Sequence, residues 1–80
     1  MLNNLQGIEE KRVILQEYYQ VVFGYNIKGM ADMARKYAGY AGNNDFINNC
    51  TEEQVDTFLR KYERSYINCK AAFGGGFIDG

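Results

Sequence analysis

The chain has 80 residues, of which 46% are hydrophobic and 24% charged, and its formal net charge is −1. This is the composition of one small globular domain, and it excludes a disordered tail and a collagen-like fibre. Nine Lys and Arg residues against ten Asp and Glu residues give no net field that would identify a binder of nucleic acid or of anionic membranes.

The sequence contains no histidine. This removes the usual general base near neutral pH, the commonest metal ligand and every nucleophile that depends on a Ser-His or Cys-His pair. Acid–base chemistry by carboxylates alone needs two of them together on an apolar face, and the sequence places none so. We therefore expect a protein that is not an enzyme, with no catalytic residue, no cofactor and no metal.

The two cysteines, Cys50 and Cys69, are separated by a predicted helix. At 1.5 Å per residue that helix puts them roughly 28 Å apart, whereas a disulfide needs Cα atoms within about 7 Å. Neither an intrachain disulfide nor a shared zinc site is expected. Free thiols fit the cytoplasm or another reducing compartment, and an intermolecular disulfide remains an alternative.

No stretch approaches the roughly 18 consecutive apolar residues of a membrane span. The first five residues have neither the basic flank nor the apolar core of a secretory signal. We expect a soluble protein without a membrane span, and import into mitochondria without a removable presequence remains open.

Apolar residues recur at steps of three and four from Leu5 to Phe23, which predicts a first helix over this range. An asparagine at position 3 or 4 can cap its start, and Gly24 stands where a left-handed residue ends a helix. Gly7 weakens the first turn by about 1 kcal/mol, so the regular helix is expected to begin near Ile8.

A second apolar stripe on this helix comprises Ile14, Tyr18, Val21 and Tyr25. A helix with two apolar faces touches two neighbours. The second neighbour is either another part of the same small bundle or a partner chain. Arg12 is the odd member of the first stripe, and its guanidinium either reaches the rim of the core or pairs with a carboxylate.

A shorter second helix is predicted from Ile27 to about Ala41, with Asn26 as its N-cap. Residues 42–45 are turn formers, and Phe46–Ile47 offers an apolar plug or a single helical turn.

A capping box at Thr51 and Gln54 predicts the start of a third helix, because each side chain can bond to the backbone amide of the other residue. Gly74 is the expected stop, which gives a helix of about 22 residues and roughly 33 Å. Asp56 and Arg60 are spaced for an i,i+4 ion pair. The apolar seam of this helix repeats at steps of four and three through Val55, Leu59, Tyr62, Tyr66, Cys69 and Phe73.

No segment alternates apolar and polar residues long enough for a strand. The fold class predicted is all-α, a small three-helix arrangement (long, short, long) with a Gly-rich C-terminal tail. Residues 1–73 form the single helical domain and residues 74–80 form the tail. Short connections favour a simple up-down-up bundle with the long helices roughly parallel, and a middle helix that crosses over the other two is the alternative.

A single core in a chain below roughly 80 residues contributes only about 3 to 5 kcal/mol, so docking on a second copy or another protein would stabilise the fold. We predict a non-catalytic α-helical protein–protein interaction module, acting as a subunit, adaptor or inhibitor of a larger assembly. The composition, with no proline and frequent Asn and Tyr, resembles that of proteins from A+T-rich genomes, including phage accessory proteins. The partner interface predicted comprises Ile14, Tyr18, Val21 and Tyr25, together with an apolar hook in the tail, Phe77 and Ile78.

The alternative function is a small nucleotide- or nucleic-acid-binding regulator that uses the third helix. Its tyrosine rings could stack on bases while Arg60, Lys61 and Arg64 neutralise phosphate. Seven tyrosines also fit a thin helical core or an interface, where the ring is buried and the hydroxyl stays wet. We therefore favour a protein partner over nucleic acid.

Overall fold

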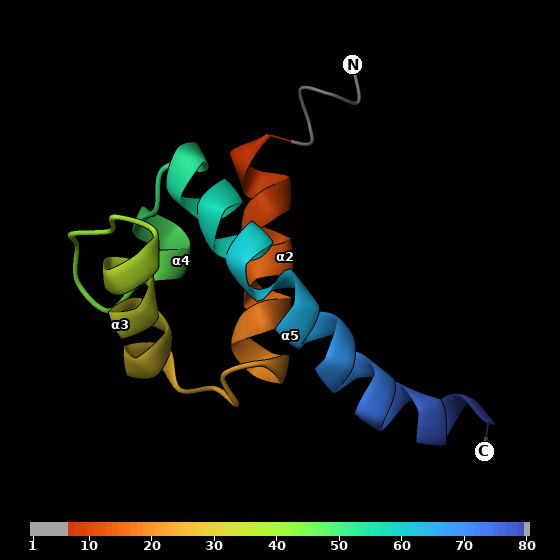
Figure 1. Cartoon of the computed structure of the whole chain (residues 1–80). Helices are drawn as coiled ribbons and strands as arrows, with labels where there is room; N and C mark the ends of the chain where they lie inside the picture. The colour runs from red at the N-terminus through yellow and green to blue at the C-terminus, as the bar shows by residue number, and fades with distance from the viewer. Residues whose placement is uncertain (1–6, 80) are drawn as a thin grey trace.

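The computed structural model describes the backbone of residues 7–79 and the side chains of residues 7–72. The described residues form helices and no strand: α2 (Ile8–Val21), α3 (Ile27–Tyr37), α4 (Phe46–Asn49) and α5 (Glu52–Asp79) (Figure 1). This confirms the all-α class and the long, short, long order of the main helices, with α4 as the single turn expected before the capping box. The N-cap asparagines proposed for the first helix lie outside the described residues.

The start and end of α2 follow the two glycines. The helix begins at Ile8, directly after Gly7, and Gly24 adopts the left-handed conformation expected of it, with φ 56°. Tyr25 is also left-handed, with φ 67°, which costs a residue with a side chain about 1–2 kcal/mol. Its backbone amide donates to the Tyr19 carbonyl at 3.0 Å and its ring meets the Tyr19 ring edge-on at 5.5 Å. These contacts hold the turn in place.

α3 ends at Tyr37, about four residues earlier than predicted. Its start is as expected, since the Asn26 side chain accepts a hydrogen bond from the Gly29 amide at 2.9 Å. At its end Gly39 turns left-handed, with φ 72°. Tyr40 then folds back, is 5% exposed, and packs edge-on against Phe46 with ring centroids 4.8 Å apart. The free energy gained by burying the Tyr40 ring therefore exceeds what another turn of helix would contribute.

The capping box of α5 forms as predicted. The Thr51 amide donates to Gln54 Oε1 at 3.0 Å, and the Gln54 amide donates to Thr51 Oγ1 at 3.1 Å. Gln54 Nε2 also donates to the Gly39 carbonyl at 3.1 Å, which ties α5 to the end of α3. The predicted stop at Gly74 is wrong, because α5 continues to Asp79. Glycine adopts right- and left-handed conformations with similar ease, so it ends a helix only where a following contact, like that of Tyr40, turns the chain.

The core lies where α2 and α5 meet α3 and α4. Phe58 is fully buried at its centre, and its ring lies 5.8 Å from that of Phe23, 5.0 Å from Phe46 and 4.8 Å from Tyr62. Stacked and tilted ring pairs at these separations stabilise the fold beyond the area that they bury. The buried residues are Leu15, Tyr18, Met30, Ala31, Ala34, Tyr40, Phe46, Ile47, Cys50, Val55 and Phe58.

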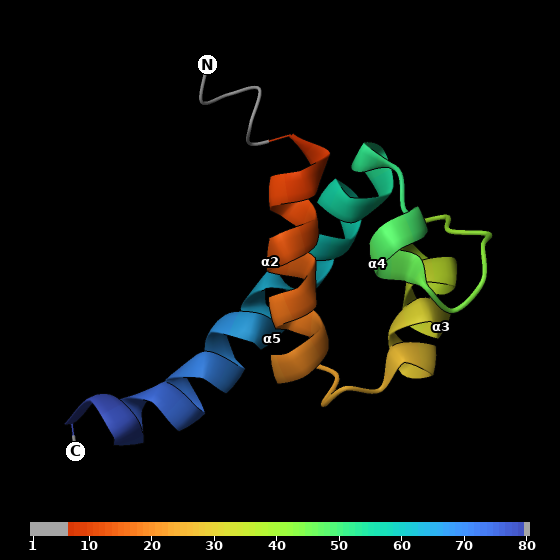
Figure 2. The ribbon, with the colours of Figure 1, turned by 180° about the vertical axis from the view of Figure 1, so that it is seen from behind.

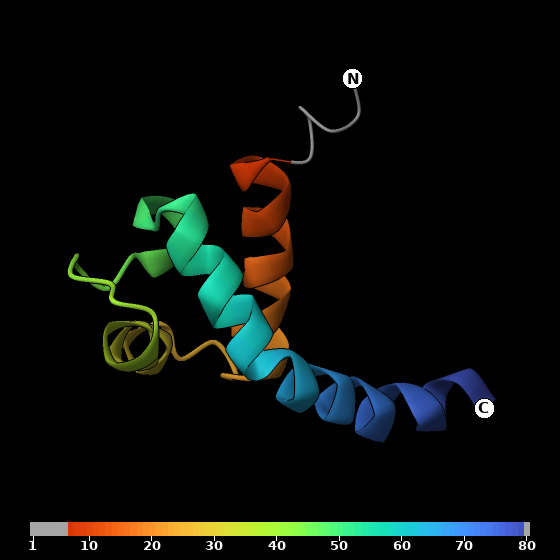
Figure 3. The ribbon, with the colours of Figure 1, turned by 45° about the horizontal axis from the view of Figure 1, so that its top comes forward.

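The two long helices cross obliquely and run in the same general direction, as expected, while α3 and α4 lie together on one side of them (Figures 1 and 2). The arrangement is thus not a simple three-helix stack, because α3 packs mainly on α4 and α5. The molecule measures 41 × 35 × 17 Å. The last turns of α5 project beyond the body (Figure 3). Among the described residues, no other helix lies on the side of α2 and α5 away from α3 and α4.

Candidate interaction surface

The exposed surface of interest is the side of α2 and α5 that faces away from α3 and α4. Lys61 of α5 contacts Tyr37 of α3, and Gln54 of α5 contacts Gly39 just after α3 ends. Ile67 comes six residues after Lys61, which places it roughly 120° around the helix. It is 51% exposed, and Ile14 of α2 is 41% exposed. We call this side the open face and define it by Lys11, Ile14, Glu17 and Val21 of α2 and Asp56, Glu63, Ile67 and Lys70 of α5.

The helical register places the two isoleucines at the edges where α2 and α5 meet. Ile14 is one turn from both Lys11 and Glu17, whose side chains reach α5. Ile67 is one turn before Lys70, whose ammonium reaches α2 at Glu17. Side chains three or four residues apart share one side of a helix, so Ile14 and Ile67 both belong to the open face.

Ion pairs mark the two ends of the open face. Lys11 Nζ lies 2.9 Å from Asp56 Oδ1 and 2.9 Å from Glu52 Oε2, and Lys70 Nζ lies 3.4 Å from Glu17 Oε2. The hydrogen bonds that the Lys11 ammonium donates to Asp56, and then to Glu52, raise the pKa of Lys11. Exposed pairs of this kind add little stability, and they join α2 to α5 at two places.

The i,i+4 pair expected between Asp56 and Arg60 is not among the ion pairs of the described residues. Asp56 turns instead to Lys11 of α2, and Arg60 stays exposed. A cation from another helix, held by packing of the two helices, outcompetes a neighbour on the same helix, whose own contribution is only a few tenths of a kcal/mol.

The residues of the predicted partner interface have different environments. Tyr18 is 5% exposed and stacks on Tyr66 of α5, with ring centroids 4.6 Å apart and an interplanar angle of 8°. Burial, with the nearby Glu63 charge, raises the pKa of its hydroxyl. The structure places Tyr18 in the chain's own core, Val21 half-buried and Ile14 exposed.

The remaining members of that interface are not brought to Ile14. Tyr25 is 64% exposed but packs on Tyr19 beyond the end of α2. The side chains of Phe77 and Ile78 lie outside the described residues. Sequence reasoning missed two exposed side chains, Val13 at 69% and Ile67. Ile67 could have been found from the sequence as an apolar residue outside the apolar seam of α5, with charged and polar residues near it.

Arg12 is half-buried and forms no ion pair with a carboxylate among the described residues. Its Nη2 donates to the Cys50 carbonyl at 3.0 Å, where α4 ends, and its Nε is buried with no hydrogen-bond partner in the described part of the chain. A cation at a helix C-terminus interacts favourably with the unpaired carbonyls there. Both thiols are free, and burial raises the pKa of Cys50. Arg12 and Cys50 therefore join α2 to the α4–α5 junction.

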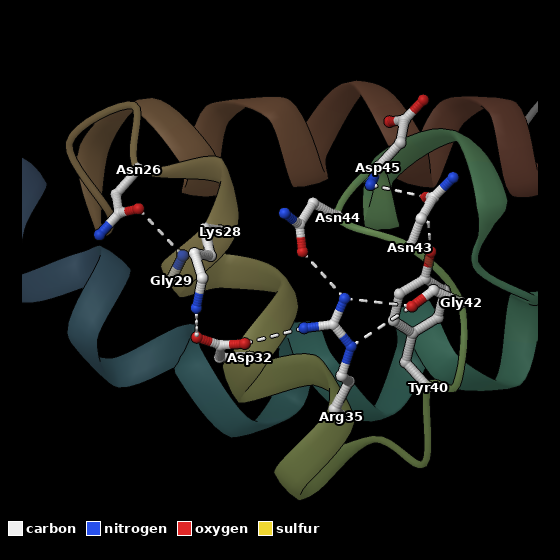
Figure 4. A network of polar contacts seen from close by, with 10 residues as sticks. All are labelled: Asn26, Lys28, Gly29, Asp32, Arg35, Tyr40, Gly42, Asn43, Asn44 and Asp45. Atoms are coloured by element: carbon white, nitrogen blue, oxygen red, sulfur yellow. Dashed lines mark hydrogen bonds and ion pairs between the residues drawn. The ribbon is translucent and has the colours of Figure 1, made fainter.

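A polar cluster around Arg35 braces the loop between α3 and α4 (Figure 4). Its guanidinium donates to Asp32 Oδ1 at 2.8 Å, to the Gly42 carbonyl at 3.1 Å and to Asn44 Oδ1 at 2.9 Å. Hydrogen bonding to Lys28 lowers the pKa of Asp32. Since the guanidinium of Arg35 donates its hydrogen bonds to groups of this chain, the cluster stabilises the loop between α3 and α4.

The cations of the alternative function do not gather around a free aromatic face. Arg60, Lys61 and Arg64 are exposed, but Lys61 Nζ sits 4.1 Å above the ring of Tyr37. Lys36 Nζ is 5.3 Å from the same ring. Tyr66 stacks within the fold and is not free to receive a base.

Among the side chains of residues 7–72, no group of three or more His, Cys, Asp or Glu could hold a metal ion. No helix within residues 7–79 is long and apolar enough to cross a bilayer.

Comparison of the chain with protein-family models, with curated proteins and with solved structures finds no match in any of the three.

Proposed function

We propose that this chain is a non-catalytic α-helical protein–protein interaction module that works as a subunit, adaptor or inhibitor of a larger assembly. The observation that carries the proposal is the exposure of branched apolar side chains on the two helices that build the core. Val13, Ile14 and Ile67 are 69%, 41% and 51% exposed, while α3 and α4 cover the other side of α5 and α2.

The distribution of polar groups supports the same proposal. Protein interfaces combine an apolar centre with a polar, solvent-accessible rim. Here Ile14 and Ile67 lie between the ion pairs Lys11–Asp56 and Glu17–Lys70. Burial of apolar area contributes about 25 cal/mol per Å², and a chain of this size gains much from covering such a face.

The test compares charges introduced on and off the open face. Ile14→Asp and Ile67→Asp place a carboxylate on it, whereas Gln16→Asp and Asn68→Asp add the same charge at exposed positions on other sides of the same helices. Tagged chains are recovered from the native source, and the co-purifying proteins, including untagged copies of this chain, are quantified by mass spectrometry. We expect the first two variants to lose their partners and the second two to keep them. Equal recovery with all four variants would overturn the proposal.

A nucleotide- or nucleic-acid-binding regulator is the second candidate, and one observation favours it. Tyr37 is 41% exposed, two lysine ammonium groups lie on its ring, and neither Lys36 nor Lys61 takes part in an ion pair among the described residues. The test is titration with RNA, DNA and cyclic nucleotides at several salt concentrations. Salt-sensitive binding that is lost on changing Arg60, Lys61 and Arg64 together would support it. No binding at low salt would exclude it.

A further inference from the structure

We infer that a basic patch between α3 and α5 binds a compact anion that carries several phosphate charges, either inorganic triphosphate or the triphosphate group of a nucleotide. The patch comprises Lys36 and Tyr37 of α3 with Arg60, Lys61 and Arg64 of α5. This inference rests on the second candidate function, because it names the ligand class for the same cations, and it uses none of the residues that define the open face.

The nearly neutral chain has a segregated distribution of charge. α3 and residues 57–66 of α5 contain six Lys and Arg residues against two acidic residues, Asp32 and Glu63, which gives a net charge of +4. Because the whole chain carries −1, the rest of it carries −5. Asp32 is already shared between Lys28 and Arg35. The four other cations of this region are exposed and form no ion pair among the described residues: Lys36, Arg60, Lys61 and Arg64.

The register of α5 crowds three of these cations together. Arg64 comes four residues after Arg60 and three residues after Lys61, and like charges at such spacings destabilise a helix. No acidic residue lies three or four residues from Lys61 or Arg64. The chain therefore keeps a cluster of repelling cations, and a bound anion would neutralise it.

The acidic residues nearest to Arg60 along α5 leave the cluster positive. Asp56 pairs with Lys11 of α2. Glu63 is on the open face and forms no ion pair among the described residues. Glu53 precedes Arg60 by seven residues, about 10 Å along the helix, which exceeds the screening length of about 8 Å at physiological ionic strength.

Tyr37 brings a cation of α3 to this cluster. Lys61 Nζ lies 4.1 Å and Lys36 Nζ 5.3 Å from the centroid of the Tyr37 ring. α3 ends at Tyr37, and the carbonyls of a helix end attract cations, but that end carries only about half a negative charge. Three full positive charges, those of Lys36, Lys61 and Arg64, exceed it, so most of the positive charge remains available to a ligand.

The extent of the patch fits a compact ligand. From Arg60 to Arg64 the helix rises about 6 Å, and a triphosphate concentrates its charges within a comparably short group. Arginine and lysine both bind phosphate, arginine through paired hydrogen bonds. A long nucleic-acid strand would also meet the acidic remainder of the chain, which repels it. Because lysine ammonium groups already lie on the Tyr37 ring, we expect recognition of the phosphates and not of a stacked base.

The experiment is an NMR titration of the ¹⁵N-labelled full chain with sodium triphosphate at low salt. We expect saturable shifts of the amide signals of residues 36–37 and 60–64, which sodium chloride at the same ionic strength does not produce. The double variant Lys36→Gln, Lys61→Gln should weaken binding about tenfold. The control, Lys28→Gln with Lys70→Gln, removes the same charge outside the patch and should stay within about twofold of the wild type.

The ring of Tyr37 is tested separately, as a positioning group for the two ammonium groups. Tyr37→Leu removes the ring and should weaken binding about threefold, whereas Tyr37→Phe keeps it and should stay within about twofold. Helical circular dichroism of each variant verifies that it is folded. Adenosine triphosphate distinguishes the two sources of the anion: an affinity equal to that of triphosphate assigns binding to the phosphates alone, and a higher one adds a contact to the nucleoside.

The absence of saturable shifts with both triphosphates overturns the inference, and so does equal weakening by the two double variants. Tighter binding of an oligothymidine strand overturns it and leaves the second candidate function in place with nucleic acid as the ligand. Tighter binding of hexaglutamate overturns it in favour of an acidic protein segment. If none of these compounds binds, the inference and the second candidate function fall together, while recovery of partners with Ile67→Asp and Asn68→Asp still tests the open face.

Discussion

Replacing Thr51 by Val removes the hydroxyl that closes the first turn of α5 and keeps the volume of the side chain. The wild-type hydroxyl accepts the Gln54 amide at 3.1 Å, and valine offers no acceptor. Loss of an N-cap side chain costs about 1 kcal/mol, within a range of roughly 0.5–2. Because Thr51 is exposed, water can satisfy the released amide, so we expect a value near 1 kcal/mol.

Gln54→Ala should cost more than Thr51→Val, because Gln54 makes two side-chain hydrogen bonds. Its Oε1 accepts the Thr51 amide at 3.0 Å and its Nε2 donates to the Gly39 carbonyl at 3.1 Å. At a net contribution of about 0.5–1.5 kcal/mol for each bond, we expect a loss of about 2 kcal/mol. The double variant should lose less than the sum, since both changes open the same turn.

The assay is urea unfolding followed by helical circular dichroism, with all variants at the same protein concentration. The midpoint should fall while the slope stays constant, and the melting temperature should fall by about 4–8 °C for each kcal/mol. Thr57→Val is the control, since Thr57 lies inside α5, its side chain makes no hydrogen bond among the described residues, and Thr and Val have similar helix propensity. A loss no larger for Thr51→Val than for Thr57→Val would refute the reasoning.

Phe58→Ala should remove about 3–5 kcal/mol, because Phe58 is fully buried among three rings; calorimetry that still finds a cooperative transition near the wild-type temperature would contradict this. Gly39→Ala should cost about 1 kcal/mol, since φ is 72° and open space around the site leaves only backbone strain; an unchanged urea midpoint would argue against it. Burial raises the pKa of Cys50, Tyr18 and Tyr62. These groups ionise more readily when unfolded, so their stabilisation is complete below about pH 8.5 and falls as the pH rises through about 10 and beyond. Urea titrations in this range check the slope, and stability independent of pH would contradict it.

The starts of α3 and α5 could be predicted because their signals are local. Asn26 and the box of Thr51 with Gln54 bond to amides within three residues of themselves. The ends could not, since Gly39 ends a helix and Gly74 does not. The two glycines differ in the tertiary contacts of the residues that follow them. Tyr40 finds a buried place against Phe46, and no pattern within the helix specifies that.

The candidate surface was predictable only in part, for a related reason. Ile14 and Tyr18 lie one helical turn apart on α2, but periodicity cannot tell which of them packs on Tyr66 and which remains exposed. Ile67 lies beside the apolar seam and is noticed only when the position of α2 is known. Lys11 meets Glu52 across 41 residues, a separation over which sequence spacing carries no information.

The parallel course of α2 and α5 has a consequence for how the chain acquires its structure. Parallel neighbours cannot meet through a tight hairpin, so contacts between them close large loops, 41 residues for Lys11–Glu52 and 53 for Glu17–Lys70. Each doubling of loop length adds about 0.6 kcal/mol of entropic cost. We therefore expect the local contacts of α3 and α4 to form early and the seating of α5 on α2 to be the late step. Mutations at the Tyr18–Tyr66 stack should then chiefly speed unfolding and leave the folding rate nearly unchanged.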